Sequence, residues 1–122
     1  VPPTLITSDS TPTTSHKDRS MWELPFVLSK LLALGMSLPQ VIRSVTETPA
    51  KAMGLVHKLG AIREGYQADL VLCRIEDRDQ ELFDSFGNQR MGHRFLEPCM
   101  TVLRGEVVYT SPAAPGLDTI LG

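Results

Sequence analysis

The pattern of hydrophobic residues changes near residue 56, and this change is the strongest constraint on the fold. Before it, apolar residues recur at the three- and four-residue spacing of helices. After it, short apolar and β-branched runs alternate with turn residues, which is typical of strands. We therefore predict a boundary there, with an α/β part at residues 1–55 and a β part at residues 56–122.

Three short helices are predicted in the first part, each with a proline near its first turn. A proline costs little there because that N–H has no intrahelical partner. The first helix covers residues 25–34 and carries a wide apolar stripe. The second begins with Ser37 and Gln40 at the spacing of a capping box. The third is expected at residues 48–53, with Thr48 as its N-cap.

Strands are expected at both ends of the chain. Leu5–Ser8 is a short apolar and β-branched run that ends at Asp9, and a polar loop follows it over residues 10–20. In the second part, turn residues separate a strong strand at 70–75 from shorter ones, expected at 61–62, 81–83, 94–96, 100–103 and 106–109. The last two strands flank Arg104-Gly105 at hairpin distance.

The charge and cysteine content exclude several functional classes. The net charge is -2 with a pI near 5.9, and no block of Lys and Arg offers a surface to nucleic acid or an anionic membrane. No apolar run approaches the length of a membrane span. Cys73 and Cys99 form no Cys-x-x-Cys pair, so we expect two reduced, mostly buried thiols in a cytoplasmic protein.

A nucleic-acid binder is the alternative that the helices suggest. Residues 28–45 have the outline of a helix-turn-helix. The second helix would offer only Arg43 and Gln40 to a groove, and the chain as a whole is acidic. We therefore do not favour it.

Four motifs together resemble the closing segment of the amidohydrolase superfamily. Their order combines a helix with Pro-Ala, a Gly-Leu exit, a Gly-x-Ile turn, a glycine and an Ala-Asp-Leu-Val strand entry. They occur at Thr48–Leu55, Leu59–Ile62, Gly65 and Ala68–Leu72. The resemblance covers residues 4 to 109, and Ser29–Gly35 is similar to the dihydroorotase, hydantoinase and deacetylase branch.

The resemblance implies a fold made of parts of two domains. Residues 1–55 would be the last strand and helices of a (β/α)8 TIM-like barrel, with Leu5–Ser8 as that strand. Residues 56–122 would supply strands of a small β-sandwich domain and a C-terminal tail. Chemistry in such barrels occurs at the C-terminal ends of the strands, which is where Asp9 would lie.

The resemblance implies that Asp9 binds a divalent metal ion and handles the proton of the attacking water. Zinc is favoured, with manganese and iron open; zinc lowers the pKa of bound water to about 7. A turn aspartate is the alternative for Asp9. His16 and Arg19 are weaker candidates for substrate binding, and a solvated loop is the alternative for both.

The departures from the family pattern limit what this chain can do alone. The family's other metal ligands, including a His-x-His, cannot be placed, and His16, His57 and His93 are isolated. We therefore predict a fragment of an amidohydrolase that acts on a small molecule, a cyclic amide, an N-acyl compound or an aminopurine, and that is inactive alone. The alternative is a non-catalytic oligomerisation module. Either way we expect a homo-oligomer, because the stripe of Leu28, Leu31 and Leu32 would lack its neighbours.

Overall fold

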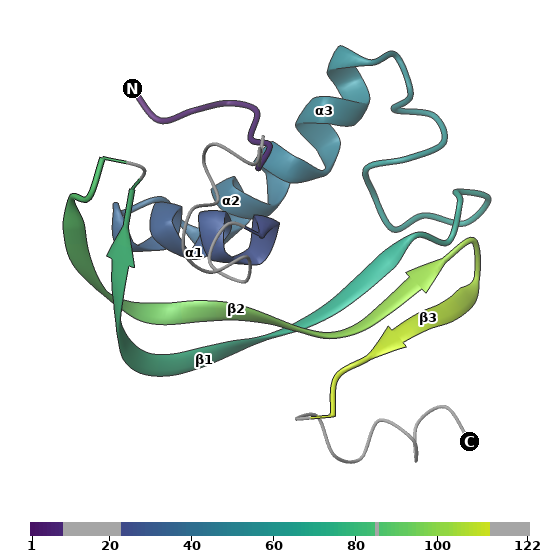
Figure 1. The fold of residues 1–122 in the computed structure, drawn as a ribbon. Coiled ribbons are helices and arrows are strands. Elements are labelled where there is room, and N and C mark those ends of the chain that lie inside the picture. The colour runs from purple at the N-terminus through teal and green to yellow at the C-terminus, as the bar shows by residue number, and fades with distance from the viewer. Residues whose placement is uncertain (9–22, 85, 113–122) are drawn as a thin grey trace.

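The computed structural model describes residues 1–8, 23–84 and 86–112, and within them three helices precede three strands. The helices are α1 (Leu24–Ala33), α2 (Leu38–Val45) and α3 (Glu47–Ala52), and the strands are β1 (Leu70–Phe83), β2 (Gln89–Leu103) and β3 (Glu106–Thr110). The helices lie above the β1–β2 hairpin, and the loop after α3 leads to its far end (Figure 1). From residue 23 onward, helices precede strands, as the sequence predicts. None of the described helices is long and apolar enough to cross a bilayer.

The helix starts follow from local hydrogen bonding. The predicted capping box of α2 is confirmed: Ser37 Oγ accepts the Gln40 N–H at 3.4 Å, and Gln40 Oε1 accepts the Ser37 N–H at 2.9 Å. The predicted start of α3 was wrong, because α3 begins at Glu47 with Thr46 as its N-cap. Glu47 also pairs with Arg43, one turn earlier in α2, at 3.4 Å.

The predicted short strands merge into one long antiparallel hairpin. Strands expected at 70–75 and 81–83 are both parts of β1, and those at 94–96 and 100–103 are both parts of β2. The register shifts at Leu72/Cys73 and between Asp77 and Gln80. Such irregularities change which face a side chain occupies, so the alternation in the sequence is interrupted although the strand continues. The predicted β2–β3 hairpin is confirmed.

Two expected strands are absent from the described residues. Residues 61–62 lie in the loop before β1, and Leu5–Ser8 has no strand pairing. A barrel strand needs a neighbouring strand for its backbone groups. Here the Ile6 N–H instead donates to the Ser44 carbonyl at the end of α2, at 3.2 Å.

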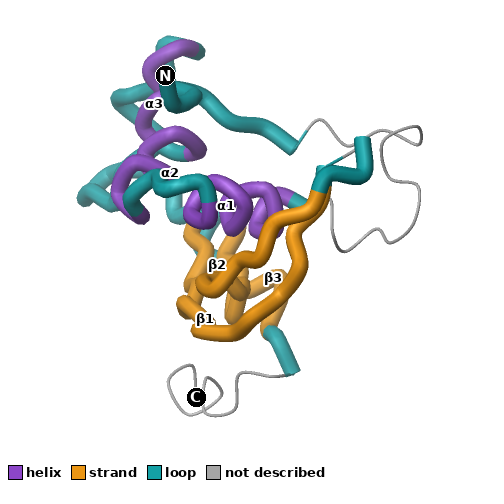
Figure 2. The backbone as a smooth tube through the Cα atoms, turned by 90° about the vertical axis from the view of Figure 1, so that its left-hand side faces the viewer, coloured by secondary structure: helices purple, strands orange, loops and turns teal. Residues whose placement is uncertain are grey.

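The hydrophobic core lies between α1, α2 and the half of the hairpin nearest its tip. Phe26 packs with Leu82 and Phe95, and Leu28 packs with Val41 and Leu96. Leu31 and Leu32 pack against the second group. The stripe is thus partly covered by α2 and the hairpin, and the homo-oligomer expected from it stays a prediction. Figure 2 shows the helices stacked on one side of the strands.

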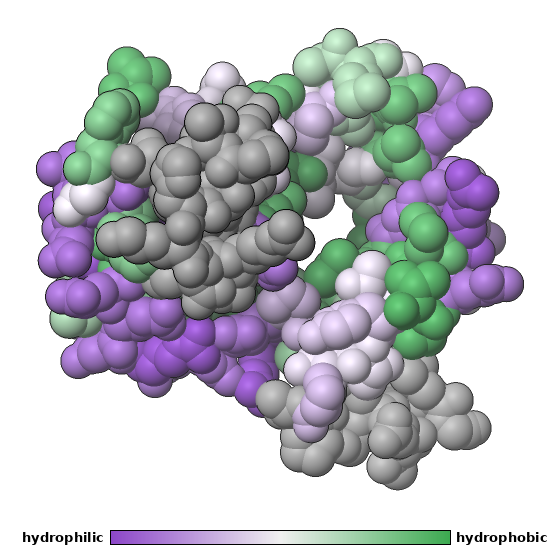
Figure 3. Space-filling view, viewed as in Figure 1, coloured by the Kyte–Doolittle hydropathy of each residue, from purple (hydrophilic) through white to green (hydrophobic). Residues whose placement is uncertain are grey.

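The other end of the sheet has no such cover among the described residues. There β1, β2 and β3 form three strands, and β3 pairs with β2 only from Met100 to Leu103. Hydrophobic residues (green) reach the surface at this end (Figure 3). They include Leu70, Val71, Leu72, Leu103, Val107, Val108 and Tyr109, each at least 39% exposed.

A single hydroxyl group joins the helices to the hairpin. Ser29 is 1% exposed. Its Oγ donates to the Pro25 carbonyl at 2.8 Å and accepts the N–H of Leu96 on β2 at 3.1 Å. Both bonds are removed from water, so loss of the hydroxyl would leave the Leu96 N–H buried without an acceptor.

We expect Ser29→Ala to lower the free energy of unfolding by about 1–3 kcal/mol, the cost of a buried unpaired donor. Urea unfolding followed by circular dichroism measures it. Ser44→Ala is the matched control, because Ser44 is equally buried at 3% but its Oγ only donates to the Val41 carbonyl within α2. If Ser29→Ala lowers the free energy of unfolding by no more than Ser44→Ala does, the Ser29 hydroxyl does not stabilise the contact between α1 and β2.

Candidate functional site

The three residues predicted to form the site lie outside the described residues. Asp9, His16 and Arg19 all belong to residues 9–22, and nothing in the structure tests their roles. The described residues on either side are placed. Ile6 is hydrogen-bonded to the end of α2, and Glu23 is the N-cap of α1.

The potential metal ligands among the described residues are dispersed. His57 is exposed in the loop after α3. The Nδ1 atom of His93 lies 2.6 Å from Asp79 Oδ1, but both side chains are more than two-thirds exposed. Within the described ranges no three His, Cys, Asp or Glu side chains are close enough to hold one ion. This part of the chain therefore does not fit the divalent metal that the resemblance implies, unless ligands come from elsewhere.

The two thiols also lack features of a reactive site. Both cysteines are free, with Cys99 buried as expected and Cys73 exposed, contrary to expectation. Partial burial raises the pKa of the Cys73 thiol, and the neighbouring Cys99 adds to this. A raised pKa lowers the thiolate fraction, so Cys73 is a poor nucleophile at neutral pH.

The glycine of the Gly-x-Ile turn holds the loop after α3 against that helix. Gly60 has φ +87°, and a Cβ at this position would lie 2.7 Å from the Ala50 Cβ and 2.9 Å from the Thr46 carbonyl oxygen. The backbone thus approaches α3 too closely for any side chain. The Pro-Ala helix and the Gly-x-Ile turn of the motif therefore pack directly against each other. The sequence alone did not reveal this contact.

Ala68 and Asp69, directly before β1, are hydrogen-bonded to the β2–β3 turn. Asp69 Oδ1 accepts the Arg104 N–H at 2.8 Å, and the Ala68 carbonyl accepts the Gly105 N–H at 2.9 Å. Asp69 thus binds an amide of the β2–β3 turn. Between the two contacts, the Tyr66 hydroxyl donates to the Val56 carbonyl at 2.6 Å and closes the loop. The contacts that these motif residues make are structural.

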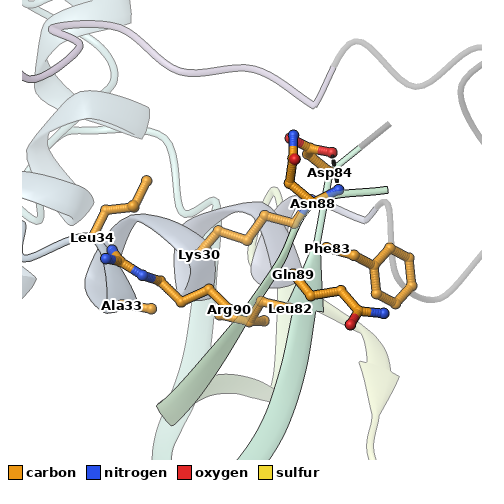
Figure 4. A pocket seen from close by; sticks show the side chains of 9 residues that line it. All are labelled: Lys30, Ala33, Leu34, Leu82, Phe83, Asp84, Asn88, Gln89 and Arg90. Atoms are coloured by element: carbon orange, nitrogen blue, oxygen red, sulfur yellow. Dashed lines mark hydrogen bonds between the residues drawn. The ribbon is translucent and has the colours of Figure 1, made fainter. Parts of the chain in front are cut away.

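Two cavities lie along α1. The first, about 230 Å³, adjoins the start of α1, and Arg78 in its wall pairs with Glu97 at 2.6 Å and stacks 4.8 Å from the Phe95 ring centroid. The second, about 240 Å³, lies between the end of α1 and the hairpin tip (Figure 4). Neither cavity brings three potential metal ligands together among the described residues.

Comparison with known proteins shows which family shares this pattern of motifs. The Amidohydrolase family matches residues 6–108. A deacetylase of Enterococcus faecalis is 30% identical over 93 residues, which are 76% of this chain and 25% of that protein. A deacetylase of Brucella anthropi is 32% identical over 78% of the chain and 23% of its own length. An imidazolonepropionase of Vibrio vulnificus is 31% identical, over 78% of the chain and 22% of that protein.

Solved structures give the same result in three dimensions. An adenine deaminase superposes with a TM-score of 0.69 at 29% identity, covering 74% of this chain and 24% of that one. A dihydroorotase superposes with a TM-score of 0.63 at 30% identity, covering 76% and 25%. The chain thus spans about a quarter of the length of each of these proteins.

We expect Gly60→Ala to destabilise the fold more than Gly65→Ala. Both glycines have positive φ, which costs an alanine about 1–2 kcal/mol, but only the Gly60 Cβ would also overlap α3, for a further ~1–3 kcal/mol. Gly65 has nothing within 4 Å of its Cβ position and is the matched control. Equal unfolding midpoints in urea for the two variants would show that the loop does not pack on α3.

Proposed function

The chain belongs to the amidohydrolase family, and on that basis we propose that it is the C-terminal part of a metal-dependent hydrolase that cleaves a non-peptide C–N bond. The observation that carries this proposal is the match over residues 6–108 by a chain that spans only a quarter of its relatives. The rest of such a protein would supply the barrel strands and metal ligands that the described residues lack.

The exposed end of the sheet supports a larger fold. Leu72, Val107 and Val108 are 45–56% exposed on a three-stranded sheet with two open edges among the described residues. Exposed apolar side chains gathered at one end of a sheet support a contact there with another segment or chain. Strands from a preceding segment would pair with these edges and complete the small β-sandwich.

Asp9 is the residue that we propose for the chemistry. It follows Ile6, Thr7 and Ser8, and the Ile6 N–H is hydrogen-bonded to the Ser44 carbonyl at the end of α2. A carboxylate at this place would accept a proton from the attacking water and return it to the leaving amine. A divalent metal ion, zinc by preference, would lower the pKa of that water. His16 and Arg19 stay weaker proposals for substrate contacts.

The substrate proposal is a cyclic amide or an N-acyl compound. The dihydroorotase among the similar structures supports the cyclic amide, and the two deacetylases among the relatives support the N-acyl group. Both reactions attack an amide carbonyl with water and release an amine, so one arrangement of Asp9 and the metal would serve either. The remaining specificity would lie in loops contributed by the rest of the barrel.

The alternative proposal is a non-catalytic oligomerisation module. It is favoured by the same exposed end of the sheet, because a second copy could pair with β3 and cover Val107 and Val108. In that case the chain would be stable only as a homo-oligomer. The two proposals differ in whether the complete protein hydrolyses an amide.

We expect Asp9→Asn in the complete zinc-loaded protein to lower kcat for dihydroorotate or an N-acetyl amino acid by about 100-fold or more, because the proton acceptor is lost. Steady-state hydrolysis assays measure this. Asp18→Asn, in the same polar segment, is the control and should retain activity. The 122-residue chain alone should be inactive. Unchanged turnover in Asp9→Asn would contradict the assignment.

We expect the isolated 122-residue chain to self-associate through the exposed sheet end, because apolar β-strand edges pair readily. Sedimentation velocity over a concentration series measures this. Val108→Lys should shift the chain to monomer, whereas Val56→Lys, at a comparably exposed valine in the loop after α3, should not. A monomer at high concentration in the unmodified chain would refute the expectation.

A further inference from the structure

A cavity lies between the end of α1 and the tip of the β1–β2 hairpin (Figure 4). Its helical wall consists of Lys30, Ala33 and Leu34. Leu82 of β1, which is 4% exposed, forms the apolar floor. The walls are mainly hydrocarbon, with charged groups at the rim (Figure 4). A cavity of about 240 Å³ suits a ligand smaller than a typical drug.

The one carboxylate in the wall is occupied by the hairpin turn. Asp84 Oδ1 accepts the N–H groups of Phe86 and Asn88, each at 2.9 Å, and Oδ2 accepts the Asn88 side-chain amide at 2.7 Å. The bond to the Asn88 side chain, followed by the backbone bonds, lowers the pKa of Asp84. Its charge therefore persists at neutral pH, and its lone pairs are largely used within the turn.

The Lys30 ammonium group is balanced by its own neighbours. Its Nζ atom lies 5.0 Å from the centroid of the Phe26 ring, a cation–π contact. Partial burial lowers the pKa of Lys30, and the Asp84 carboxylate opposes that shift. The two charges of Lys30 and Asp84 thus offset each other at one side of the cavity.

Arg90 leaves an unbalanced positive charge at the same cavity. It lies opposite Leu82 in the β1–β2 register. Figure 4 shows its side chain extending along the cavity toward Leu34. Across the described ranges, 1–8, 23–84 and 86–112, no acidic side chain pairs with its guanidinium. A planar guanidinium beside a hydrocarbon wall is suited to bind a carboxylate through two parallel hydrogen bonds.

We propose that this cavity binds a small amphipathic carboxylate. The carboxylate pairs with Arg90, and the hydrocarbon part packs on Ala33, Leu34 and Leu82. A bare inorganic anion would leave the apolar wall exposed, and a neutral apolar molecule would leave the guanidinium unpaired. The proposal does not depend on the hydrolytic function, because it uses none of the residues 9–22.

Isothermal titration calorimetry with octanoate, on the complete protein that contains this chain, tests the proposal. We expect octanoate to bind with a Kd below about 1 mM, and Arg90→Gln to weaken it at least about tenfold, as expected for loss of a charged hydrogen-bond pair. Arg94→Gln is the matched control, an exposed arginine on the same strand that lines neither cavity. It should leave the Kd unchanged.

Two further measurements separate this site from nonspecific binding. Octanol, which has the same chain length without the charge, should bind at least about tenfold more weakly than octanoate. Leu34→Glu places a negative charge at a position that is 64% exposed, where the fold tolerates it, and should abolish octanoate binding. No binding of octanoate at 10 mM, on the order of ten times the expected Kd, would overturn the proposal. Equal binding of octanol, or a Kd unaffected by Arg90→Gln, would also overturn it.

Discussion

The Ser29 hydroxyl links α1 to β2 through a hydrogen bond with Leu96, which lies 67 residues further along the chain, and the position of the helices depends on it. It accepts the Leu96 N–H of β2 while donating to the Pro25 carbonyl of its own helix. Around it, Phe26 and Leu28 project from α1 onto the same hairpin and exclude water. Because the hydrogen bond is directional and the packing is not, the hydroxyl selects one register of α1 along β2.

The motif residues act at the opposite end of the same framework. Gly60 brings the loop onto α3, and Asp69 ties the start of β1 to the β2–β3 turn. Together they determine how the helical part is joined to the sheet. The motif residues thus join the helical part of the chain to the sheet through close backbone packing and one carboxylate.

Among the described residues, the helices cover only one end of the sheet. At the hairpin tip, α1 and α2 bury Leu82, Phe95 and Leu96, but the other end of the sheet leaves Val107 and Val108 exposed. Its surface ion pairs, such as Arg43 with Glu47, contribute little to stability in water. Such uneven cover is expected under the proposal that this chain is part of a larger hydrolase.

The sequence by itself determined the local elements and the family. Capping at Ser37 and the turn at Arg104-Gly105 were predicted correctly because short-range hydrogen bonds and backbone preferences fix them. Asp9, His16 and Arg19 were proposed from the resemblance and stay predictions. Only the tertiary structure decided that β1 and β2 are each one long strand, that the hairpin covers α1, and that Leu5–Ser8 pairs with no strand among the described residues. Those features depend on contacts between residues far apart in the chain, which local patterns do not encode.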